Sequence, residues 1–108
     1  LITKHTLRLP SVVGGPLEDE PRTFWVLYGH LSWNSIAQWK KGDRFMQGDV
    51  LAAMGDESEN GGWPPHVHVQ MSWEAPVDGD LPGVVRHEDR ADALQRYPDP
   101  RLICGPLY

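Results

Sequence analysis

Apolar and polar positions alternate in two stretches near the start of the chain. Residues 1–9 alternate imperfectly, and residues 23–28 are rich in β-branched and aromatic side chains. A period of two is the pattern of a half-buried strand. The intervening residues 11–22 contain prolines, a glycine pair and an acidic run, which indicates a loop. We expect the two strands to pair as a hairpin with a long loop.

The middle of the chain is punctuated by turn residues. Residues 35–40 predict a short helical turn, with Asn34 or Ser35 as its cap. In residues 41–56 the dipeptide Gly-Asp recurs three times between brief apolar stretches. Glycine permits a positive φ and Asp bonds to nearby backbone, so each pair predicts a bend between short strands.

The remaining pattern adds one more strand and a tail. Residues 57–65 indicate a loop, and residues 66–73 a third strand. Residues 74–108 form a proline-rich, acidic segment, expected to be a loop-rich tail with a short helix at 88–95. The expected fold class is therefore mainly β, a small antiparallel sheet or sandwich with long loops. A chain of 108 residues is long enough for a single domain.

Charge and composition narrow the possible partners. The net charge is −5 and no basic stripe is present, so a nucleic acid partner is not expected. No run approaches the roughly 20 apolar residues that span a bilayer. Cys104 is the single cysteine, so neither an internal disulfide nor a cysteine zinc site is expected.

The histidines are the strongest candidates for chemistry. His66 and His68 stand at i and i+2 in an apolar run, so on a strand both rings face the same way. Neutral imidazole is a common zinc ligand and also carries protons. His30 follows the strand of residues 23–28, at the expected rim of the sheet. Each histidine alone is more often structural, but the three together predict one cluster.

Three motifs in order resemble a known family. They are YGHLS at 28–32, the Gly-Asp run at 42–56 and PHVHVQ at 65–70. Together they resemble the catalytic core of the M23, or lysostaphin-like, zinc metallopeptidases, over roughly residues 1–73. Three ordered motifs are more specific than any one of them.

The resemblance implies a fold, a cofactor and an activity. The fold would be the M23 peptidase sheet (duplicated hybrid motif), and the activity Zn²⁺-dependent hydrolysis of peptide bonds in peptidoglycan-type substrates. By position, His68 would be a zinc ligand. His30 and His66 would be the catalytic pair that orients and deprotonates water and steadies the charge on the carbonyl oxygen. Tyr28 and Trp63 are the expected substrate-binding residues; the alternative for Trp63 is a structural lid over the strand end.

The chain departs from the family pattern at the metal. The family takes two zinc ligands from an H-x-x-x-D motif, but His5 is followed four positions later by Leu9, not Asp. Residues 1–108 are therefore expected to be a single M23-like domain without this segment, and whether the chain is an enzyme stays open. Three alternatives remain. The missing ligands lie upstream or on a partner chain, the domain is a non-catalytic module, or His30, His66 and His68 hold zinc themselves.

Two further segments resemble one variant of the family. They are NGGWPP at 60–65 and YPDPRLI at 97–103. The variant occurs in large fusions with a class III aminotransferase, which implies other domains of the same polypeptide as partners. The alternative function is then a binding or structural module of such a protein. The family is usually found in the cell envelope or secreted, whereas the fusion variant would be cytoplasmic, so the sequence leaves the localisation open.

Overall fold

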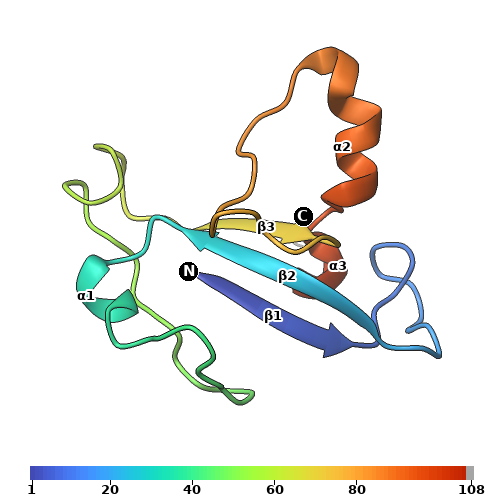
Figure 1. Ribbon diagram of the computed structural model, residues 1–108, viewed down its shortest axis with the longest axis horizontal. Helices are drawn as coiled ribbons and strands as arrows, with labels where there is room; N and C mark the ends of the chain where they lie inside the picture. The colour runs from blue at the N-terminus through green and yellow to red at the C-terminus, as the bar shows by residue number, and fades with distance from the viewer. Residues whose placement is uncertain (107–108) are drawn as a thin grey trace. The chain divides into compact units, whose positions relative to one another are not determined.

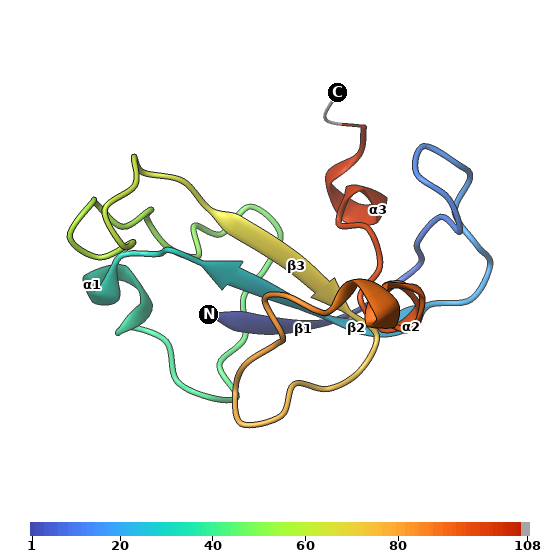
Figure 2. The ribbon, with the colours of Figure 1, turned by 90° about the horizontal axis from the view of Figure 1, so that it is seen from above.

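A computed structural model describes residues 1–106 and has a small, mainly β architecture. Its sheet contains the strands β1 (Ile2–Leu7), β2 (Arg22–Gly29) and β3 (His68–Ser72), in the order β1-β2-β3 (Figure 1). Neighbouring strands run antiparallel (Figure 2). The expected mainly β class is confirmed at this level.

The first two strands form the predicted long-loop hairpin. Ile2 lies opposite Leu27 and Leu7 lies opposite Arg22, so the pairing extends over the whole of β1. The alternation in β2 places Phe24 and Val26 on one face, where they are 1% and 0% exposed. Burial of these side chains is what the period-two pattern predicted.

The described helices are short. They are α1 (Trp33–Ile36), η1 (His87–Asp89), α2 (Arg90–Arg96) and α3 (Arg101–Cys104). The expected helix at 88–95 is confirmed by η1 and α2. The expected tail also contains α3, in which the Arg101 amide donates to the carboxylate of Asp99 at 2.9 Å. Residues 107–108 of the tail lie outside the described part. None of the helices in residues 1–106 is long and apolar enough to cross a membrane.

The expected cap of the first helical turn is wrong. The helix begins earlier than predicted, and its cap is Ser32, whose hydroxyl accepts from the Ser35 amide at 3.4 Å. The amide of Trp33 is held by the carboxylate of Glu59 at 3.0 Å. A contact so distant along the chain shifts the start of the helix in a way that local cap preferences do not reveal.

The expected short strands in residues 41–56 are also wrong, since this fully described segment contains none. The bends at its first two Gly-Asp pairs are present, with Gly42 and Gly48 at φ 95° and 90°. The carboxylates of Asp43 and Asp49 then accept from the amides three residues earlier, at 2.8 and 2.7 Å. Side-chain bonds of this kind compete with a strand ladder and leave turns in its place.

The chain divides into two compact units. One contains Leu1 and Tyr28–His68, and the other residues 2–27 and 69–106 of the described chain. The buried apolar side chains of residues 1–106 all lie in the second unit: Leu9, Phe24, Val26, Met71, Leu81 and Ala93. The first unit contains the three candidate histidines.

Candidate functional site

His30 follows β2 directly and has an unusual backbone. Its φ is +62°, in the left-handed region that few residues other than glycine adopt. The carbonyl of His30 accepts from the Gly55 amide at 2.8 Å. Two residues further on, the Ser32 amide donates to the carbonyl of Ala53 at 2.9 Å. Two backbone bonds therefore hold the turn that carries the imidazole.

Gly55 is where these two segments approach most closely. A Cβ at this position would stand 3.1 Å from the carbonyl oxygen of His30 and 3.2 Å from that of Leu31. Glu59 ties the same region together, because its carboxylate accepts from the amides of Trp33 at 3.0 Å and Asp56 at 3.3 Å. The absence of a side chain at Gly55 is therefore part of how His30 is placed.

The H-x-H pair does not lie within one strand as expected. β3 begins at His68, and His66 precedes it in an extended segment. Pro64 and Pro65 enter this segment without amide hydrogens, so pairing with a neighbouring strand cannot start there. The ring of His66 instead bonds to the carbonyl of Pro64.

The three predicted histidines nevertheless come together. The ring of His30 lies 4.5 Å from that of His66 and 6.2 Å from that of His68, measured between centroids. All three residues are exposed, so solvent and ligands can reach them. Segments far apart in the sequence thus meet at one cluster, within the first unit.

The proton on His66 is placed by its hydrogen bond. Nδ1 lies 2.8 Å from the carbonyl oxygen of Pro64. A carbonyl can only accept, so Nδ1 must carry the hydrogen. In the neutral ring Nε2 then keeps a free lone pair, able to accept a proton or bind a metal.

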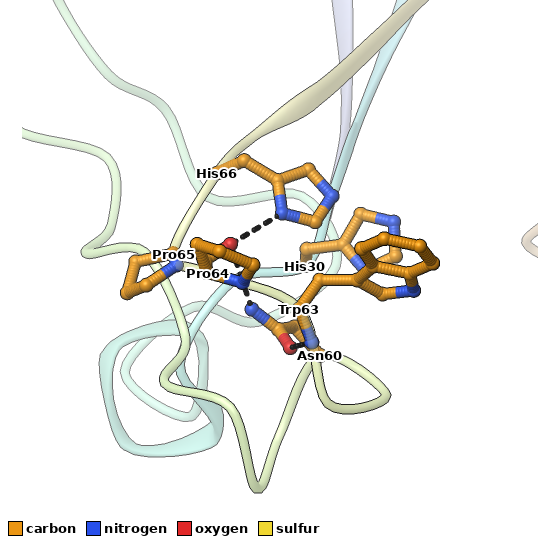
Figure 3. Close-up of a pocket in the computed structure, with 6 residues that line it drawn as sticks. All are labelled: His30, Asn60, Trp63, Pro64, Pro65 and His66. Carbon is orange, nitrogen blue, oxygen red and sulfur yellow. Dashed lines mark hydrogen bonds between the residues drawn. The ribbon is translucent and has the colours of Figure 1, made fainter.

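A pocket of about 490 Å³ opens beside this pair (Figure 3). Its lining residues are His30, Asn60, Trp63, Pro64, Pro65 and His66. Trp63 is 67% exposed, which is unusual for so large an apolar side chain. Tyr28, also expected to bind substrate, lines a separate hollow of about 190 Å³ that shares His30. The structure therefore places Trp63, and not Tyr28, in the pocket with both His30 and His66.

The described residues do not complete a zinc site. No group of three or more His, Cys, Asp or Glu side chains in residues 1–106 could hold a metal ion. Two histidines on one tetrahedral zinc have ring centroids about 5 Å apart, shorter than the 6.2 Å between His30 and His68. The carboxylate of Asp56 is engaged within its own loop. It accepts from the hydroxyl and amide of Ser58, and these hydrogen bonds lower the pKa of Asp56.

Two residues with structural roles in the site were not predicted. Gly55 was predicted only as part of a Gly-Asp bend, and Asn60 only as part of a motif. Asn before Gly-Gly is a common turn signal, which was available in the sequence. Nothing local signals the close approach of Gly55 to His30.

The family was also sought by comparison with known proteins. Models of protein families, curated proteins and solved structures all gave no match to this chain. The resemblance to M23 peptidases therefore rests on the three ordered motifs in the sequence.

Proposed function

We propose that this chain carries the histidine cluster of an M23-type zinc metallopeptidase domain that acts on peptide bonds of peptidoglycan-type substrates. The observation that carries the proposal is the convergence of His30, His66 and His68, with His30 at 4.5 and 6.2 Å from the other two rings. Their order along the chain is that of the family motifs. The fold proposed is accordingly the M23 type of small antiparallel sheet.

His66 and His30 would be the proton-carrying pair. The Pro64 carbonyl holds the hydrogen on Nδ1 of His66, so Nε2 is available as a base. His30 lies across the pocket rim from this ring, where an imidazole can steady negative charge on a substrate carbonyl. A proton can then move between substrate and protein without rearrangement of the His66 ring.

His68 would be the metal ligand among these residues. Catalytic zinc sites use three protein ligands, and the described residues do not supply them. The other two ligands are therefore proposed to lie outside the described residues. Residues 1–108 by themselves are proposed to be inactive.

Hydrolysis by the polypeptide as its gene encodes it tests this function. Glycine-containing peptidoglycan peptides would be incubated with the protein and zinc, and the products identified by mass spectrometry. Removal of a general base typically costs about 10²- to 10⁴-fold in rate, so His66→Ala and His30→Ala should lower cleavage by that order. His68→Ala should lower both cleavage and bound zinc.

A histidine of the other unit provides a matched control. His87→Ala removes an exposed imidazole from the second unit and should keep cleavage within about twofold, because substitutions of exposed side chains outside the cluster usually have small effects. Equal cleavage by His66→Ala and His87→Ala would contradict the assigned roles. Absence of zinc-dependent cleavage by the encoded polypeptide would contradict the peptidase function.

A second function is favoured by the pocket itself. Trp63 is 67% exposed beside two prolines, and such flat apolar faces suit the binding of sugars or peptides. A non-catalytic binding module, for example in a protein that carries a class III aminotransferase, would use the same pocket without a metal.

Binding without cleavage would identify this second function. Soluble peptidoglycan fragments would be titrated into the protein, and binding followed by calorimetry. Trp63→Phe should weaken binding by up to about tenfold, because the smaller ring covers less of the ligand. Trp33 has a matching exposure of 69% but does not line this pocket, so Trp33→Phe should leave binding unchanged. Equal effects of the two variants would count against the pocket.

A further inference from the structure

Asn60 is a buried polar residue in an otherwise exposed loop. Its exposed fraction is 4%, whereas residues 61–68 are all exposed. Burial of an amide is costly unless its hydrogen bonds are made. The partners of this side chain therefore indicate why an amide is buried here.

Both ends of the Asn60 amide bond to the pocket wall (Figure 3). Oδ1 accepts from the backbone amide of Trp63 at 2.9 Å, and Nδ2 donates to the carbonyl of Pro64 over a longer 3.4 Å. The orientation of the amide follows, since the reverse would set two donors against each other. One side chain thus holds the backbone of two successive pocket residues.

The same Pro64 carbonyl also accepts from His66. Nδ1 of His66 lies 2.8 Å from this oxygen. The position of the oxygen depends on the turn at 60–64, in which Gly61 and Gly62 adopt φ of 86° and 90°. The Gly62 amide closes the turn by donating to Glu57 at 2.9 Å.

We propose that Asn60 is a positioning residue that, through the Pro64 carbonyl, keeps the hydrogen of neutral His66 on Nδ1 and its Nε2 lone pair free. The same amide holds Trp63 at the pocket. The value of a free Nε2 for hydrolysis rests on the proposed function, but the position of the hydrogen does not. An experiment can therefore contradict the role of Asn60 without contradicting the peptidase function, and the reverse.

Side-chain ¹⁵N NMR of histidine tests the proposal without metal or substrate. At about pH 8.5, where exposed imidazoles are neutral, His66 should be mainly in the Nδ1–H form. In Asn60→Asp, Oδ1 can still accept from Trp63, but the donor to Pro64 is lost and a charge faces the carbonyl. Once the Pro64 carbonyl is no longer held toward His66, its hydrogen bond from Nδ1 is weakened. The ratio of Nδ1–H to Nε2–H in His66 should then fall by up to about fivefold, the scale of that one hydrogen bond.

Two further variants keep the test decisive. Asn60→Ser is a smaller polar replacement, for use if Asn60→Asp does not fold, and should shift the ratio in the same direction. Asn34 is the other asparagine of the chain and lies exposed in α1, so Asn34→Ala should leave the His66 ratio unchanged. A mainly Nε2–H form in the unchanged protein, or an unaltered ratio in a folded Asn60 variant, would overturn the proposal.

Discussion

The imidazole of His30 is presented by a backbone conformation that suits glycine better than histidine. A left-handed residue with a Cβ is strained by about 1–2 kcal/mol, and such residues concentrate at functional sites. His30 has φ +62° and is held there by the bond from the Gly55 amide. The site therefore stores strain where its central ring is placed.

Two substitutions of His30 distinguish the contribution of the imidazole to stability from that of the backbone conformation. His30→Gly and His30→Ala both remove the imidazole, but only glycine adopts φ +62° without strain. We expect the free energy of unfolding of His30→Gly to exceed that of His30→Ala by about 1 kcal/mol. Urea denaturation would measure it. A more stable His30→Ala would show that the left-handed conformation is not held in solution.

His5 makes stability depend on pH. Its ring stacks on Phe24 at 5.1 Å, and burial lowers its pKa below the ordinary 6.5. The unfolded chain then takes up a proton that the folded chain resists, so stability is full above about pH 6.5 and is lost as the pH falls through the folded pKa.

A non-titrating residue at this position provides the comparison. Between about pH 7.5 and pH 5, the urea midpoint of the unchanged protein should fall further than that of His5→Gln, because only the unchanged protein has a titrating group at this position. Parallel pH profiles for the two proteins would contradict the lowered pKa of His5.

At the scale of elements, the sequence predicted those strands whose formation depends on the alternation of apolar and polar residues. The hairpin of β1 and β2 followed from alternation, because burial of Phe24 and Val26 requires it. The strands expected in 41–56 did not form, because the side chains of Asp43 and Asp49 bond to the backbone first. The start of β3 at His68 was displaced by prolines whose effect on pairing depends on the neighbouring strand.

The junction between the His30 turn and the Gly55 segment is the sharpest test at this scale. Gly55→Ala places a Cβ 3.1 Å from the His30 carbonyl, so one segment must move. We expect a loss of about 1–3 kcal/mol in the free energy of unfolding, as for other overpacked sites. Gly83→Ala meets nothing within 4 Å and is the control, expected to change stability little. Equal stability of the two variants would contradict the close approach.

At the scale of the whole molecule, packing and chemistry fall in different units. The buried apolar side chains lie in the second unit, and the three histidines lie in the first. The sequence predicted the meeting of His30, His66 and His68 because ordered motifs carry that information. It did not reveal Asn60, whose role arises only when the turn at 60–64 closes around its amide.

NMR of the five histidine side chains of the 108-residue chain tests the central claim, the convergence of the three rings, most directly. Because the rings of His30 and His66 lie 4.5 Å apart, we expect nuclear Overhauser effects between their ring hydrogens, and weaker ones between His30 and His68 at 6.2 Å. His66→Ala should remove the first effect and keep the second. Absence of any effect between His30 and His66 in the folded chain would contradict the convergence.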